Sequence, residues 1–369
     1  MLTRRTFITT AAVTGLGATG VLTFHSLSKG SSEYEQAVKQ IWRHGERGSS
    51  DAPAVLRELV RYATLAPSSH NTQCWKFRLG DLSVSILPDY QRRCPIVDPD
   101  DHHLFVSVGC AAENLVQAAS AMGFRDDTVF NKGANESLDI SLVRAREVRT
   151  PLFEAIPRRQ STRGEFDAKP LSNDELRLLE TAGSGNGVRV HLITDKQAME
   201  NVLDFVVEGN TAQMRDPAFV RELKDWLRFN GGQAARQGDG LFSGSSGNPS
   251  APSWLGGPMF DFFFTEKAEN DKYVRHVRSS AGIAVFVSER EDKNHWIEAG
   301  RAFQRFALQA TAMDVRTAHL NQPVEVASLR SQFARSVGIS IGRPDLVIRF
   351  GRGPEMPRSL RRPIEAVLL

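Results

Sequence analysis

The spacing of apolar and polar residues predicts a helix, a hairpin and a second helix at the start of the globular part of the chain. Apolar residues recur at helical spacing from about Ala52 to Ala66, with Asp51 as the expected N-cap and a proline in the first turn. WKFRL and LSVSILPD then read as two strands that turn at Gly80 and Asp81. A long helix is expected from about His103 to Met122, and LDISLVR predicts a further strand.

The second half begins with a short helix and a polar loop. The next helix should be capped by Ser172, with Glu175 as its partner in a capping box. A stretch rich in glycine and serine, NGGQAARQGDGLFSGSSGNPSAPSWLGGP, belongs to an insertion at about residues 195–290. Two interpretations stay open for it: a disordered insertion, or a mobile lid whose aromatic residues Phe242 and Trp254 rest on a functional site.

An internal repeat is indicated by two helical segments that align without a gap, residues 108–124 and 299–315. Five of the seventeen aligned positions are identical, and Gly109 and Gly300 are one of these pairs. In both halves an amphipathic helix also precedes a small polar loop with one asparagine, Asn71 or Asn186, and then a strand. We therefore expect a duplicated unit.

The N-terminal segment differs from the rest of the chain. Arg4 and Arg5 precede an uncharged run from Phe7 to His25, which is typical of a twin-arginine export signal. A chance basic start on a short membrane anchor is the alternative, and without a clear cleavage site the segment could remain as a tether. This predicts that the export machinery is a partner and that the protein works in the periplasm or on the outer face of the cytoplasmic membrane.

Composition excludes several classes of protein. The chain has 369 residues, 41% of them hydrophobic, and a net charge of +3 with the basic residues spread out, so nucleic acid is not an expected partner. Its three cysteines, Cys74, Cys94 and Cys110, have no spacing typical of a metal site, and no disulfide framework follows from them. No metal is predicted.

The most informative stretch is LAPSSHNTQCWKF, residues 65–77. Pro67 ends the first helix, and two serines, a histidine, an asparagine and a glutamine follow, which is more polar groups than a turn requires. This loop, together with RRQSTRGEF at 158–166 and RSLRRPIEAVL near the C-terminus, resembles the signature segments of the nitroreductase family of FMN-binding proteins. The order of the motifs is most similar to the Acg-like branch, in which two units are fused.

The resemblance implies an α+β fold of two fused copies, a pseudo-dimer of mainly antiparallel sheets flanked by helices. The expected boundaries are 1–30 for the signal or tether, 31–52 for a linker, 53–150 for the first unit and 151–369 for the second, which contains the insertion. Members of the family bind flavin between two subunits. A fused chain would therefore be a monomer with one composite FMN site.

The residues that match the family's motifs are expected to hold FMN. Arg159 would bind the phosphate, with Arg361 and Arg362 reinforcing it, because guanidinium groups bind phosphate bidentately. Arg163 would lie near the pyrimidine edge of the ring and tune it. Phosphate, ribityl or ring-edge contacts are expected from Gln160, Ser161, Pro67, Ser68, Ser69 and Asn71. Cys74 departs from the family, which has a proline there.

The implied activity is two-electron reduction of a small acceptor, such as a nitro compound or a quinone, by hydride transfer through flavin N5. No residue is expected to be a dedicated catalytic acid, and His102 and His103 are interpreted as exposed residues of a capping turn. No G-x-G-x-x-G follows a strand, so NAD(P)H is not assigned as the donor. The alternative is a flavin-binding or flavin-sequestering protein with little turnover.

Overall fold

The computed structural model describes residues 18–45, 51–133 and 136–369, and their side chains from residue 30 onward. Arg4, Arg5 and the first part of the uncharged run lie outside the described residues. The first half of the fold consists of α3 (Ala52–Thr64), β1 (Trp75–Leu79), β2 (Ser83–Pro88), α4 (His102–Ala121), β3 (Phe124–Asn131) and β4 (Ser137–Arg144). These strands form an antiparallel sheet in the order β1-β2-β4-β3.

The second half forms another antiparallel sheet, in the order β5-β8-β10-β9. Its elements are α5 (Pro151–Ala155), α6 (Asn173–Gly183), β5 (Val188–Ile193), β8 (Gly282–Ser288), α12 (Lys293–Ala312), β9 (Arg316–His319), α13 (Gln322–Glu325), α14 (Ala327–Ser336) and β10 (Arg343–Gly351). When the strands of each sheet are matched in chain order, both sheets have the same strand order, with α4 corresponding to α12. The expected α+β class and mainly antiparallel sheets are confirmed.

Local sequence patterns gave most of these elements. The hairpin of β1 and β2 turns where it was expected, and α6 has the full capping box of Ser172 and Glu175. Strand β3 was not predicted, because its first part contains three consecutive charged residues, RDD, and aspartate is uncommon in strands. Helix α4 is long and apolar enough to cross a membrane, but most of it is buried inside the protein, as expected for a core helix.

The start of α4 corrects one expectation. His102 and His103 are buried, not exposed, because this end of the helix packs against β10. The His102 imidazole is hydrogen-bonded to the Asp345 carboxylate at 2.8 Å, and His103 Nε2 is 3.3 Å from the Asp345 carbonyl oxygen. The Asp98 carboxylate accepts the main-chain N–H groups of His103 and Leu104 at the start of the helix, whereas Asp101, which directly precedes the helix, makes no capping bond with its side chain.

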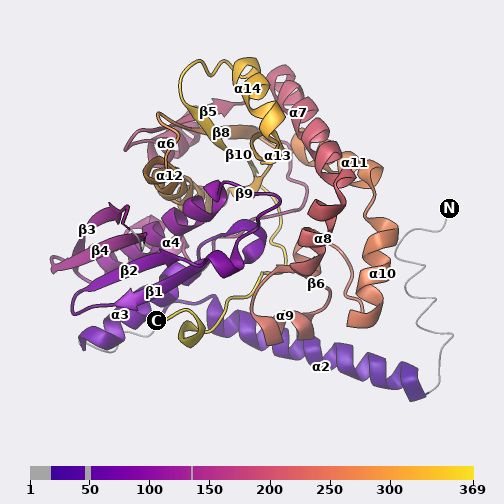
Figure 1. Ribbon diagram of the computed structural model, residues 1–369, viewed down its shortest axis with the longest axis horizontal. Helices are drawn as coiled ribbons and strands as arrows, with labels where there is room; N and C mark the ends of the chain where they lie inside the picture. Colours follow the sequence, from indigo (N-terminus) through magenta and orange to yellow (C-terminus); the bar gives the residue numbers. More distant parts are fainter. Residues whose placement is uncertain (1–17, 46–50, 134–135) are drawn as a thin grey trace.

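The two halves meet along α4 and α12, which lie side by side between the sheets (Figure 1). Gly109 of α4 lies against the carbonyl oxygen of Ile297, and Gly300 of α12 lies against that of Val106. The two glycines of the aligned segments are therefore equivalent in space, each allowing the other helix to approach its backbone. Hydrogen-bonded polar groups flank this crossing, for example Gln304 Nε2, which donates to Asn114 Oδ1 at 2.7 Å.

The segment expected to be a linker is largely helical. Helix α2 (Ala18–Ile41) runs along one edge of the molecule beneath α9 (Gly231–Gln237), and Gly30 lies against the backbone of Gly232 (Figure 1). The Tyr34 hydroxyl donates to the carbonyl oxygen of Arg358 at 2.7 Å. Residues 31–52 were interpreted as a linker because most of them are polar and only a few make the apolar contacts that hold the helix.

The insertion is also folded. It contains α7 (Lys196–Arg215), α8 (Pro217–Asp225), β6 (Leu227–Arg228), α9, β7 (Leu241–Phe242), α10 (Ser253–Phe263) and α11 (Glu266–Arg278). Phe242 is buried against the Tyr34 ring, with ring centroids 4.7 Å apart. Trp254 is 74% exposed, so this residue does not rest on a site as the lid interpretation expected.

Replacing Gly109 with alanine should destabilise the protein, because the new methyl group would overlap the Ile297 carbonyl, a backbone atom that cannot swing away. We expect a loss of about 1–3 kcal/mol in the free energy of unfolding, measured by urea denaturation. Gly257→Ala in α10 is the matched control, since its Cβ would meet only the Lys224 side chain, at 3.4 Å. Equal unfolding midpoints for the two variants would contradict a close helix crossing.

Candidate functional site

The loop after α3 has an unusual backbone. His70, Asn71 and Gln73 all have positive φ values, of 46°, 54° and 55°, which non-glycine residues seldom adopt. The Ser68 hydroxyl accepts the N–H of Gln73 at 2.9 Å and closes the turn. Such a conformation persists only where the surrounding structure holds it, and loops of this kind are concentrated at functional sites.

Two amide side chains hold the loop to distant parts of the chain. Asn71 Nδ2 donates to the carbonyl oxygens of Gly240 at 2.9 Å and Leu360 at 3.1 Å. Gln73 Nε2 donates to Gly238 O at 2.9 Å, and Gln73 Oε1 accepts the N–H of Arg362 at 2.9 Å. Part of the polar surplus seen in the sequence therefore connects the loop to the insertion and the C-terminal tail.

Arg361 is saturated by protein oxygens. Its guanidinium donates to the main-chain oxygens of Thr64, Leu65 and Ala66 at 2.7–3.1 Å. Its remaining donors face Asn71 Oδ1 at 2.9 Å and the carbonyl oxygens of the tail. Arg361 was expected to bind a phosphate, but its donors are occupied by protein oxygens, and it fixes the tail to the end of α3.

Arg159 has donors to spare. It is 2% exposed, and only its Nη2 has a partner, the carbonyl oxygen of Leu65 at 3.2 Å. Its Nε and Nη1 are buried and have no hydrogen-bond partner among the residues that the structure describes. Burial lowers the pKa of Arg159 to about 10, so the group remains charged at neutral pH, and the charge of Arg358 also disfavours the cation. A buried cation with two unpaired N–H groups fits an anionic ligand.

The other predicted site residues differ in how many of their polar groups already have hydrogen-bond partners within the protein. The Gln160 amide is paired with the main chain of Met356, and Ser161 forms an isolated β-bridge with Thr317. Arg362 donates to Ala366 O at 2.6 Å and keeps Nη1 unpaired. Pro67 and Ser69 are half-buried in the loop beside them.

Arg163 lies under the insertion and among neutral imidazoles. Its Nη1 is 3.4 Å from the Ser245 hydroxyl. Burial, followed by the charge of Arg163, lowers the pKa of His70 to about 4 and that of His319 to about 3. Both imidazoles are therefore neutral at physiological pH, and each can donate one hydrogen bond without adding charge.

Two residues near Arg163 were not predicted from the sequence. His319 ends β9 and Tyr273 lies in α11, and no local motif marks either residue. Only the fold brings them near Arg163. Burial is the main cause of both pKa shifts, raising the pKa of Tyr273 and lowering that of His319, and the charge of Arg163 acts to lower both. His70 was visible in the loop motif, but its role could not be assigned because its neighbours come from other segments.

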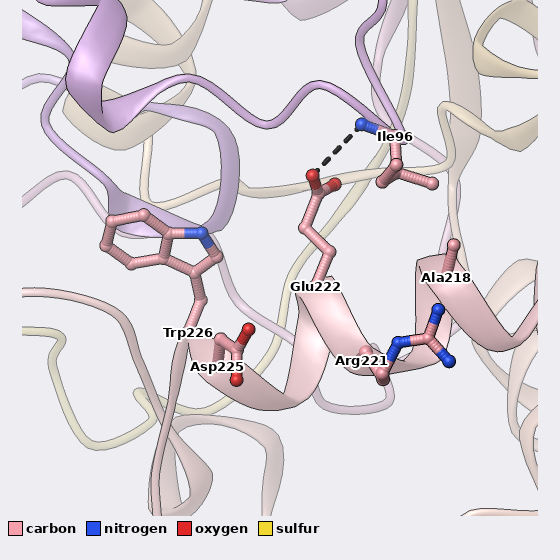
Figure 2. Close-up of a pocket in the computed structure, with 6 residues that line it drawn as sticks. All are labelled: Ile96, Ala218, Arg221, Glu222, Asp225 and Trp226. Carbon is pink, nitrogen blue, oxygen red and sulfur yellow. Dashed lines mark hydrogen bonds between the residues drawn. The ribbon is translucent and has the colours of Figure 1, made fainter.

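A surface pocket of about 340 Å³ opens between α8 and the segment at Ile96. Figure 2 shows Glu222 reaching from α8 toward Ile96, with Trp226 and Arg221 on either side. The pocket therefore joins the insertion to the first half of the chain. The residues that line it were not among those expected to form a site.

Comparisons with known proteins give a consistent picture. No protein-family model matches the chain. Two proteins of Mycobacterium tuberculosis, both named provisionally as NAD(P)H nitroreductases, are similar over 85% of this chain. Rv3131 is 25% identical over 324 residues, 90% of its length, and Acg is 22% identical over 330 residues, 95% of its length.

Among solved structures, a provisionally named nitroreductase from Anabaena variabilis matches 86% of this chain and 91% of its own, with 10% identity and a TM-score of 0.45. The FMN-dependent nitroreductase NfnB from Mycobacterium smegmatis, solved in complex with NADPH, matches 58% of this chain and 96% of its own, with 12% identity and a TM-score of 0.39. The sequence relatives, which span nearly the whole chain, support the nitroreductase superfamily, including its Acg-like members, as the group to which this protein is related.

Proposed function

We propose that this protein is an FMN-dependent oxidoreductase with one composite flavin site, formed by the loop after α3, the segment 158–163 and the insertion. The observation that carries the proposal is Arg159, a buried guanidinium whose Nε and Nη1 lack partners. A phosphate dianion would satisfy both groups and offset the cost of burying the charge. The names of the relatives, provisional NAD(P)H nitroreductases, point to the same chemistry.

The residues of this chain would divide the work of holding FMN. Arg159 would bind the phosphate, and the free Nη1 of Arg362 is a second candidate donor. Arg163, held by Ser245 and flanked by neutral histidines, would place one fixed positive charge near the ring. Bound FMN would supply hydride transfer at its N5 atom, and the acceptor would be a small nitro compound or quinone.

A binding protein with little turnover is the second candidate. The contacts of the insertion favour this candidate. Gly238 and Gly240 accept hydrogen bonds from the loop after α3, and Ser245 accepts one from Arg163. An insertion that stays in place would restrict access of a donor to flavin. Rapid loss of the flavin absorbance on adding NADPH would support the enzyme, and no loss with any nicotinamide donor would support the binding protein.

The duplication is part of the proposal. The matched strand order of the two sheets and the paired glycines of α4 and α12 support a chain made from two fused copies. Such a chain contains both halves of its own interface, so it would work as a monomer. The domain boundaries expected from the sequence remain a proposal on the same grounds.

Arg159 and Arg163 should affect flavin binding in different ways. Arg159→Ala removes a charge-assisted contact worth about 1.5–3 kcal/mol, which corresponds to a loss of FMN affinity of about tenfold to somewhat over a hundredfold. Arg163→Ala should weaken binding less but lower the two-electron potential of bound flavin, because the reduced anion loses a stabilising charge. FMN titration of the apoprotein and potential measurement against a reference dye would separate the two effects.

Arg158→Ala is the matched control for both variants. Arg158 is adjacent in sequence, but it is half-exposed and paired with Asp314 at the surface, so flavin affinity and potential should not change. The assignment of roles fails if Arg159→Ala behaves like Arg158→Ala, or if Arg163→Ala leaves the potential unchanged.

Export by the twin-arginine route is also proposed, from the Arg4-Arg5 pair and the uncharged run that follows it. Replacing both arginines with lysine keeps the charge but removes the guanidinium pair that this route reads. The expected result is folded protein retained in the cytoplasm, measured by cell fractionation and immunoblotting. Unchanged export of the double variant would point to the general secretory route or to a simple membrane anchor.

A further inference from the structure

Three potential metal ligands that are distant in sequence come together at Glu222, one of the residues that line the pocket of Figure 2. They are His70 of the loop after α3, Cys94 of the segment before α4, and Glu222 of α8. Their ligand atoms, an imidazole nitrogen, a thiol sulfur and a carboxylate oxygen, all lie within 4.8 Å of one another. Ligands around a zinc ion are typically about 2.0–2.3 Å from the metal, so small side-chain rotations would bring the three atoms to one ion.

Each of the three groups keeps a lone pair with which it could bind a metal ion. In the described part of the chain, His70 Nε2 is buried and has no hydrogen-bond partner, which leaves an unexplained polar atom in the interior. Cys94 is 3% exposed and forms no disulfide. The Glu222 carboxylate accepts the main-chain N–H groups of Ile96 at 3.0 Å and Val97 at 3.1 Å. These bonds orient the carboxylate but leave further lone pairs, as in metal sites where an outer set of hydrogen bonds fixes the ligands.

A neighbouring cluster shows the contrast. Asp98, His102 and His103 are also close together and fully buried. Their polar atoms, however, already have protein partners: Asp98 binds two main-chain N–H groups of α4, and both histidines bind Asp345. That cluster is explained by the start of α4. The His70 cluster differs at its imidazole, because His70 Nε2 is buried and has no hydrogen-bond partner among the described residues.

We propose that His70, Cys94 and Glu222 bind one divalent transition-metal ion of the zinc class. Imidazole nitrogen, thiolate sulfur and carboxylate oxygen are the three ligand types that Zn²⁺ takes in proteins. The adjoining pocket, which Glu222 lines, gives the ion a route from solvent and leaves room for water as a fourth ligand. The bound ion would tie the loop after α3 to α8 of the insertion.

Binding should release a proton from Cys94. The thiolate, not the thiol, is the metal ligand, so a bound ion displaces the proton of Cys94. Affinity should therefore rise with pH. This site could not be predicted from a local motif, because its ligands are separated by 24 and 128 positions and come from different segments.

The test is metal binding by the full chain, independent of flavin chemistry. Zn²⁺ competition against a chromogenic chelator should give one tight site per chain, and Co²⁺ substitution should give a near-ultraviolet charge-transfer band from the thiolate. Cys94→Ser and Glu222→Gln should each lower Zn²⁺ affinity by at least about tenfold, and Cys94→Ser should abolish the Co²⁺ band. FMN content is measured in the same samples, so failure of this site and failure of the flavin proposal are distinguishable.

Cys110→Ser is the matched control, since Cys110 is another buried free cysteine but lies at the crossing of α4 and α12. Its Zn²⁺ affinity and Co²⁺ band should match those of the unaltered protein. Glu222 is only half-buried, so Glu222→Gln decides the matter even if Cys94→Ser fails to fold. No tight Zn²⁺ site in the unaltered protein, or equal affinity in the Glu222→Gln and Cys110→Ser variants, would overturn the proposal.

Discussion

The last carbonyl groups of α3 organise the candidate site. A helix ends with carbonyl oxygens that lack intrahelical partners and carry the negative end of the helix dipole. Here Thr64, Leu65 and Ala66 present these oxygens to the interior, where two guanidinium groups meet them. Arg361 comes from the C-terminal tail and Arg159 from the segment after α5. The C-terminal tail and the segment after α5, which are far apart in sequence, therefore both bind to the end of α3.

The difference between these two arginines defines what the site can do. Arg361 spends its donors on protein oxygens, so it serves as a fixed connection. Arg159 uses a single donor and keeps two buried N–H groups unpaired. Burying an unpaired charge costs free energy, and an anionic ligand bound to Arg159 would offset that cost. His70 and His319 are neutral, so the positive charge beside the loop is that of Arg163. Together, Arg159 and Arg163 suit a ligand with a phosphate at one end and a polar ring at the other.

Local sequence patterns predicted the parts of the fold that depend on neighbours in sequence. The capping box of α6 and the hairpin of β1 and β2 follow from residues that are close in sequence, whereas the α+β class was implied by the family resemblance. The same patterns could not reveal partners at long range. Arg361 Nε donates to Thr64 O, 297 residues earlier in the chain, and Asn71 binds Gly240, 169 residues later. The burial of His102 depends likewise on Asp345, so only the folded chain explains it.

The resemblance to flavin-binding proteins pointed to the loop after α3 and to the arginine motif at 158–163, but it could not divide the residues between binding and support. That division depends on which hydrogen bonds are already made inside the protein. Asn71 and Gln160, both expected to contact flavin, have their amides satisfied by main-chain groups or by Arg361. Arg159 does not.

The most direct test of the account is the cofactor content of the purified full-length protein. Its visible absorption spectrum should show bound flavin, and denaturation should release FMN rather than FAD. The account predicts one FMN per chain, because one loop after α3 and one Arg159 form a single composite site. No flavin after incubation with FMN, or two FMN per chain, would contradict it.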